Sequence, residues 1–120
     1  MAKRLVIKLI TGKDDPERLS GALNVASAAI ASGVEVSLWL TSDSSWFALP
    51  GKISEVELAH SPDLGEILQM IIDNGSVTLC TQCAMRRGID KSDLIEGIEI
   101  KGAASFVEEI ASENCQALVY

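Results

Sequence analysis

Short runs of branched aliphatic residues alternate with segments of helical periodicity along this chain. Residues 5–11 form a nearly continuous apolar run of the kind found in strands buried on both faces. In residues 17–32 the apolar side chains recur at helical spacing, with Asp15 suited to the N-cap, Pro16 to the first turn and Gly33 to the C-terminal stop. Strands that alternate with helices need crossover connections, which produce parallel sheets. The pattern therefore predicts an α/β fold.

The remaining segments continue this alternation. Strands are expected at 34–40, 76–80, 98–101 and 115–120, and helices at 63–73, 81–87 and 103–112. Residues 42–51 are predicted to form a loop, and residues 52–60 have no clear pattern. Since no repeat, low-complexity segment or long linker divides the chain, residues 1–120 are expected to form one domain. The predicted architecture is a doubly wound, flavodoxin-like three-layer sandwich with a mostly parallel sheet of about five strands.

Composition narrows the classes of protein to which the chain can belong. Of its 120 residues, 48% are hydrophobic, which is ample for one core. A net charge of −7 argues against nucleic acid as a partner, because binding to the phosphate backbone needs a cationic surface. No apolar stretch approaches the roughly 20 residues of a membrane span, and the first residues do not resemble a signal peptide. Three cysteines without an export signal predict a cytoplasmic protein with reduced thiols.

The residues with the most distinctive chemistry are Cys80 and Cys83, which lie where an expected strand meets an expected helix. With Cys80 or Thr81 as the N-cap, both sulfurs fall in the first helical turn, where the helix dipole and nearby Arg86 and Arg87 favour thiolate over thiol. A thiolate in this position can attack a disulfide, a persulfide or a peroxide. The spacing of the cysteines does not choose among these reactions.

Two further loops are expected beside these thiols. Residues 11–15 and 41–45 also follow the carboxyl ends of predicted strands, and in parallel sheets ligand sites form at that edge. Asp43 lies in the second of these loops, and the aromatic pair Trp46 and Phe47 follows it. The aromatic side chains either cap the core or wall a pocket or an interface.

A metal site is the alternative to this thiol chemistry. Cys80, Cys83, Cys115 and His60 could formally supply three sulfurs and one nitrogen to zinc. A second closely spaced pair of ligands is lacking, Cys115 is expected to be structural in a core strand, and His60 to be a solvated loop residue. The chain also lacks a phosphate-binding glycine loop, a dinucleotide-binding fingerprint and a serine nucleophile elbow. We therefore expect no metal and no cofactor.

These features resemble the DsrE/TusD-like (DsrE/DsrF-like) family of small sulfur-relay proteins over nearly the whole chain. The strand, polar turn, alanine-rich helix and second strand of that family are similar to residues 6–43. Its most specific element is a cysteine at a strand end followed by a small-residue helix and Arg-Arg-Gly, which is matched by Cys80 and by Arg86, Arg87 and Gly88.

The resemblance implies that Cys80 accepts sulfane sulfur as a persulfide and passes it to a partner protein. On that basis the start of the helix at Thr81, together with Arg86, stabilises the thiolate, while Trp46 and Phe47 line the mouth of the site. The implied partners are sulfur donor and acceptor proteins and other subunits, in a homo-oligomer (trimer or hexamer) or a hetero-oligomer of related chains.

Cys83 departs from the TusD-like pattern and resembles family members with a paired Cys-x-x-Cys. This second thiol could resolve a persulfide on Cys80 into a disulfide. Two alternatives to the sulfur carrier stay open. One is a thiol-disulfide or peroxide oxidoreductase that cycles Cys80 and Cys83. The other is a non-catalytic oligomeric binding subunit that uses the loop edge with Trp46 and Phe47.

Overall fold

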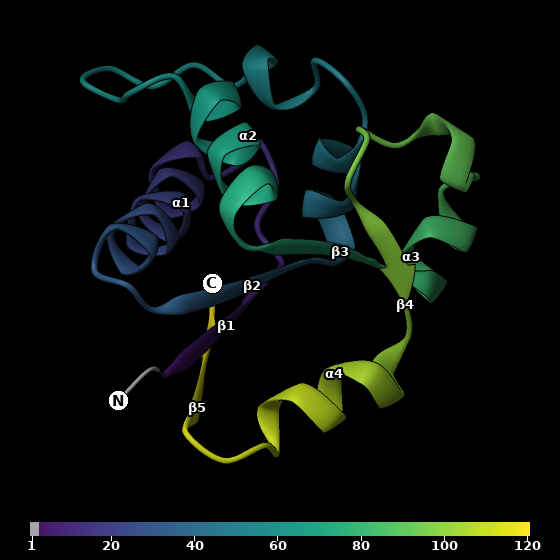
Figure 1. The fold of residues 1–120 in the computed structure, drawn as a ribbon. Coiled ribbons are helices and arrows are strands. Elements are labelled where there is room, and N and C mark those ends of the chain that lie inside the picture. The colour runs from purple at the N-terminus through teal and green to yellow at the C-terminus, as the bar shows by residue number, and fades with distance from the viewer. Residues whose placement is uncertain (1–2) are drawn as a thin grey trace.

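Five parallel strands form a single sheet in the order β4-β3-β2-β1-β5 in the computed structural model, which describes residues 3–120 (Figure 1). The strands are β1 (Arg4–Leu9), β2 (Glu35–Leu40), β3 (Ser76–Cys80), β4 (Glu99–Lys101) and β5 (Cys115–Val119). The helices are α1 (Pro16–Ala31), α2 (Leu64–Asn74), α3 (Thr81–Arg86) and α4 (Ala103–Ile110). The predicted α/β class and parallel five-stranded sheet are confirmed. The prediction of one domain over residues 1–120 stays a prediction, and Met1 and Ala2 lie outside the described residues.

The first two helices each begin at an aspartate side chain, and for α1 this is the cap that the sequence predicts. The Asp15 carboxylate accepts a hydrogen bond from the Arg18 amide at 3.1 Å, and Pro16 opens α1. Asp63 does the same for α2, where it accepts from the Gly65 and Glu66 amides at 2.8 and 3.2 Å. Such side chains satisfy amides that the helix itself leaves unpaired.

The two faces of the sheet differ in composition. Because side chains alternate along a strand, β1, β2 and β3 direct one set of residues toward α1 and α2 and the other set toward α4 (Figure 1). We call the first set the aliphatic face, and its buried members are Ile7, Leu9, Val36, Leu38, Leu40, Val77 and Leu79. We call the second set the mixed face, and it includes Val6, Lys8, Ser37, Trp39 and Thr78.

The mixed face is covered by α4, and Trp39 makes the main contacts between them. The indole Nε1 of Trp39 donates a hydrogen bond to Glu109 Oε2 at 3.1 Å, and its ring meets that of Phe106 edge to face at a centroid distance of 5.3 Å. None of the residues of α4 is fully buried. At the neighbouring edge strand β5, Leu118 and Val119 are exposed, and Cys115 at its start is half-buried. The final strand therefore lies at the surface, whereas the sequence predicts a core strand.

The segment predicted as a loop after β2 is largely a 3₁₀ helix, η1 (Ser42–Ala48). Thr41 and Ser44 form a reciprocal capping box at its start. Both hydroxyls also donate to the backbone oxygen of Leu9, the last residue of β1, at 2.9 and 2.6 Å. These hydrogen bonds tie the start of η1 to the carboxyl end of the sheet.

Within residues 3–120, no helix combines the length and the apolar character needed to cross a membrane.

Candidate thiol site

Cys80 and Cys83 lie together at the junction of β3 and α3. Cys80 is both the last residue of β3 and the N-cap of α3, and it is half-buried. It lies opposite Lys101 of β4 in the sheet register. Cys83 sits in the first turn of α3 and is buried, with 8% of its surface exposed. The structure thus places both thiols at the predicted edge, with Cys80 as the more accessible of the two.

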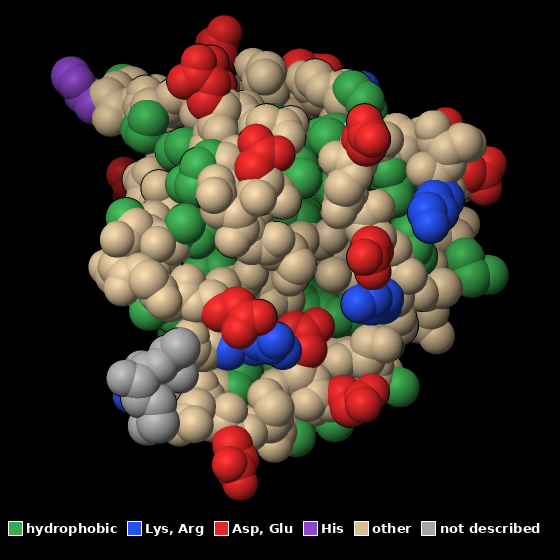
Figure 2. Space-filling model, in the orientation of Figure 1, with side chains coloured by type: hydrophobic (Ala, Val, Ile, Leu, Met, Phe, Trp, Pro, Cys, Tyr) green, Lys and Arg blue, Asp and Glu red, His purple; other side chains and the backbone are tan. Residues whose placement is uncertain are grey.

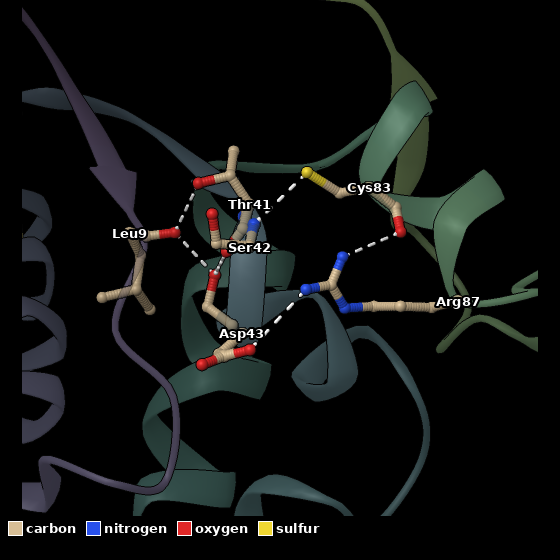
Figure 3. Close-up of polar contacts among 7 residues, drawn as sticks. Leu9, Thr41, Ser42, Asp43, Cys83 and Arg87 are labelled. Atoms are coloured by element: carbon tan, nitrogen blue, oxygen red, sulfur yellow. Dashed lines mark hydrogen bonds and ion pairs between the residues drawn. The ribbon is translucent and has the colours of Figure 1, made fainter.

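The sulfur of Cys83 is held by the start of η1. The backbone N–H of Ser42 donates to Cys83 Sγ at 3.3 Å (Figure 3). Ser42 is the first residue of η1, where amides have no partner within the helix and are free to bind elsewhere. Its φ of 49° places it in the left-handed region. A main-chain donor aimed at sulfur in this way favours the anionic form of the thiol.

The electrostatic surroundings of Cys83 favour a thiolate. Burial by itself raises the pKa of the Cys83 thiol. The Ser42 amide, the neighbouring Cys80 and Ser45 groups and the charge of Arg87 lower that pKa by more, so that it lies below the ordinary value of a cysteine. At neutral pH, Cys83 is therefore ionised to a greater extent than a solvent-exposed cysteine.

Arg87 connects the thiol site to η1. Its Nη1 donates to the backbone oxygen of Cys83 at 3.1 Å, and its Nη2 lies 3.6 Å from Asp43 Oδ1 (Figure 3). The guanidinium also lies 5.9 Å from the ring centre of Trp46. Arg86, which the resemblance singles out, is exposed. Its predicted role stays a prediction, and Arg87 is the arginine that contacts Cys83.

The aromatic pair divides between surface and core. Trp46 is 40% exposed, whereas Phe47 is 3% exposed and belongs to the core. Both line a cavity of about 450 Å³ together with Asp43 and the lysines Lys13 and Lys52. Neither cysteine lines this cavity, so that Asp43 and Trp46 are its link to the thiol site through Arg87.

The sequence also names Thr81 as part of the thiol site and Cys115 as a formal metal ligand. Thr81 opens α3 directly after Cys80 and is half-buried. Cys115 is the first residue of β5, whereas Cys80 is the last residue of β3. Because the sheet is parallel, the two cysteines lie at opposite ends of its strands. Within residues 3–120, no three His, Cys, Asp or Glu side chains are grouped to hold a metal ion.

Sequence reasoning missed Ser42 and Ser45 of η1 as parts of this site. Ser45 is fully buried, and its side chain is among the groups that lower the pKa of Cys83. The signal that could have found them is the run Thr41-Ser42-Asp43-Ser44-Ser45, which is rich in helix-capping residues and follows a strand. Such a run predicts a helix start at the edge of the sheet, with free amides directed toward the thiols.

A close approach between the loop after β1 and η1 helps to position the thiol site. At Gly12, in the loop after β1, an added Cβ would lie 2.6 Å from Asp43 Cβ. Only glycine allows the loop to pack this closely against η1. The absence of a side chain at position 12 therefore helps to set the position of the residues that hold Cys83.

Fold and site together define a small parallel α/β protein with a thiol pair at the carboxyl edge of its sheet. The sequence profile of the DsrE/DsrF-like family matches residues 3–117. The chain belongs to the DsrE/DsrF-like family.

Two relatives that are similar in sequence are described as uncharacterized proteins. The chain is 29% identical over 105 residues to an uncharacterized protein of Methanocaldococcus jannaschii, and the match covers 87% of this chain but 38% of that relative. It is 32% identical over 85 residues to an uncharacterized protein of Methanopyrus kandleri, with 70% of this chain and 67% of the relative covered. The chain thus spans less than half the length of the first of these relatives.

Two solved structures share the fold. The YchN protein of E. coli matches over 100% of both chains with a TM-score of 0.80 and 24% sequence identity. A protein of unknown function from Methanobacterium thermoautotrophicum matches 98% of this chain and 99% of its own with a TM-score of 0.72 and 15% identity. At these identities the matches show likeness of fold.

Proposed function

We propose that the protein is a sulfur carrier that accepts sulfane sulfur as a persulfide on Cys80 and relays it to a partner protein. The observation that carries this proposal is the placement of Cys80, half-buried at the carboxyl edge of the sheet and within reach of an incoming thiol. Cys83, in contrast, is buried. Membership of the DsrE/DsrF-like family supports the same chemistry.

The transfer has two balanced steps. The Cys80 thiolate attacks the terminal sulfur of a donor persulfide, the sulfur–sulfur bond of the donor breaks, and the donor leaves as a thiolate. An acceptor thiolate then attacks the outer sulfur of the Cys80 persulfide, and Cys80 leaves as a thiolate in turn. No net oxidation or reduction occurs in either step.

Sulfur-relay complexes provide the partners under this proposal. We expect donor and acceptor proteins and a homo-oligomer (trimer or hexamer) or a hetero-oligomer of related chains, in the reducing cytoplasm that three free cysteines favour. Acidic side chains are spread over the face drawn in Figure 2, with lysine and arginine side chains scattered among them. An acceptor with a basic patch would complement this charge.

Intact-mass measurement after incubation with glutathione persulfide tests the proposal. In the Cys83→Ser background, we expect the protein to gain one sulfur atom that cyanide removes as thiocyanate. Adding Cys80→Ser should abolish this gain, while Cys115→Ser, the matched control, should leave it intact. A gain that survives Cys80→Ser would overturn the proposal.

A second candidate is an oxidoreductase that cycles Cys80 and Cys83 between dithiol and disulfide. The observation that favours it is the placement of both thiols at the start of α3, where Cys80 is the N-cap and Cys83 lies in the first turn. Hydrogen peroxide without any sulfur donor should then remove two hydrogen atoms from the protein only when both cysteines are present. Equal oxidation of Cys83→Ser would exclude this activity, and a reduction-potential titration would place the couple.

A further inference from the structure

We infer that the persulfide on Cys80 has a second reaction besides relay. In this internal displacement, the sulfur of Cys83 displaces the sulfane sulfur as hydrosulfide and leaves a Cys80–Cys83 disulfide. This inference rests on the proposed loading of Cys80. It adds an activity to relay, because sulfane sulfur is then reduced to sulfide when no acceptor protein takes it. Three features of the site carry it: the seclusion of Cys83, its main-chain donor and the hydroxyl of Ser45.

The position of Cys83 restricts its reaction partners. With 8% of its surface exposed, it offers little access to a donor or acceptor protein. Cys80, which caps the same short helix, is close enough to influence the ionisation of Cys83. A buried thiolate with one neighbouring sulfur is suited to an internal displacement rather than to exchange with another protein.

The start of η1 supplies fixed donors to that thiolate. The Ser42 amide lies 3.3 Å from Cys83 Sγ, and η1 is itself anchored to β1 through Thr41 and Ser44. Arg87 joins the end of α3 to η1, since it binds the Cys83 carbonyl and lies 3.6 Å from Asp43 (Figure 3). Donors held in this way stabilise the Cys83 thiolate before it attacks and so raise the fraction of Cys83 that is ready to react.

Ser45 provides an independent observation that points to an anion at this place. Its side chain is 0% exposed, and its Oγ has no hydrogen-bond partner among residues 3–120. An unpaired buried hydroxyl costs folding free energy, and such groups recur where a reaction uses them. Ser45 lies one turn of η1 after Ser42, whose amide binds Cys83 Sγ, and its side chain is among the groups that lower the pKa of that thiol. We therefore assign Ser45 as a positioning residue whose hydroxyl becomes a donor to Cys83 when that thiol ionises.

The displacement balances in atoms and electrons. The Cys83 thiolate attacks Cys80 Sγ, a sulfur–sulfur bond forms between the two cysteines, and the bond from Cys80 Sγ to the outer sulfur breaks. The outer sulfur leaves with that electron pair and keeps the persulfide proton, so that the product is hydrosulfide. The outer sulfur is reduced by two electrons, and the cysteine pair is oxidised to the disulfide. An external dithiol is required only to reset the pair for another turnover.

A single-turnover experiment on the full chain tests the inference. The protein is mixed with one equivalent of glutathione persulfide, released sulfide is trapped with monobromobimane, and the protein mass is measured. We expect the parent to release about one equivalent of sulfide above a donor-only control and to lose two hydrogen atoms. Cys83→Ser should instead keep the added sulfur atom and release no sulfide, and Cys83→Ala should repeat that result.

The two proposals fail in different ways in this experiment. If Cys83→Ser and Cys83→Ala gain no sulfur while their circular dichroism matches that of the parent, loading of Cys80 is wrong. If the parent keeps the added sulfur and forms no disulfide, the loading of Cys80 is correct and the internal displacement by Cys83 is wrong.

The role of Ser45 has a matched control in the chain. Ser37 on β2 also has a buried hydroxyl with no hydrogen-bond partner among residues 3–120, but it lies toward the start of that strand, away from the thiols. We expect Ser45→Ala to slow sulfide release about tenfold and to move its rate–pH profile to higher pH, because the Cys83 thiolate loses a donor. Ser37→Ala should leave both unchanged. Equal profiles for the two variants would overturn the assignment of Ser45.

Discussion

The two faces of the sheet are built by the same strands but serve different ends. On the aliphatic face, Leu38 and its neighbours are fully buried beneath α1 and α2. On the mixed face, Lys8 and Trp39 meet α4, which has no fully buried residue. Hydrophobic burial is the main source of stability, so the aliphatic face should dominate the free energy of unfolding. The mixed face and the carboxyl edge can then hold polar groups and reactive thiols without a large loss of stability.

The largest expected effect comes from a cavity in the aliphatic face. Leu38→Ala removes a fully buried side chain from the centre of the sheet. We expect a loss of about 3 kcal/mol in the free energy of unfolding, measured by urea denaturation. A loss below about 1 kcal/mol would contradict the leading role given to this face.

A smaller loss is expected where α4 meets the mixed face. Trp39→Phe keeps an aromatic ring beside Phe106 but removes the indole N–H that donates to Glu109. We expect a loss of about 1.5 kcal/mol, because the acceptor is a carboxylate. Glu109→Gln, which preserves an acceptor, should lose less. If Trp39→Phe is as destabilising as Leu38→Ala, the two faces contribute equally.

Helix caps sharpen the comparison further. Asp63 caps α2 on the aliphatic side through its carboxylate, whereas α4 begins at Gly102 without a side-chain cap. Asp63→Ala should cost about 1 kcal/mol in thermal or urea unfolding. Asp63→Asn, another good cap, should retain most of that stability. Equal losses in both variants would mean that the charge of Asp63 matters rather than its capping hydrogen bonds.

The smallest effect on the isolated chain is expected at the exposed edge strand. Val119 is 63% exposed, so Val119→Lys should change the free energy of unfolding by less than about 0.5 kcal/mol. If copies of the chain associate through β5, the same change should reduce the oligomer in sedimentation velocity at unchanged stability. A large loss of stability at protein concentrations where only monomer is present would show that β5 belongs to the core.

The sequence pattern predicts most of the fold because burial and periodicity are local signals. The strands, the four α-helices and the cap Asp15 could all be recognised from neighbouring residues. The exposure of β5 could not, since an apolar strand has the same pattern whether a helix or solvent covers it. The 3₁₀ helix η1 was also missed, because short helices of this type have weak periodicity.

The thiols and the loops around them were predictable, but the contacts between them were not. The position of Cys80 and Cys83 follows from a strand that ends where a helix begins. The amide that binds Cys83 is 41 residues away in sequence, and no local pattern reports that contact. The choice between Arg86 and Arg87 depends on which side of α3 faces η1, which only the packing of the two elements decides.

The contact between Arg87 and Trp46 gives the protein an optical reporter of its own. The chain has two tryptophans, and they occupy opposite environments: Trp39 is 1% exposed, and Trp46 is 40% exposed beside a cation that binds the Cys83 carbonyl. A change in the bonding of Cys83 that displaces Arg87 should alter the emission of Trp46 and leave Trp39 as an internal reference. Stopped-flow fluorescence could therefore follow the thiol chemistry without any added label.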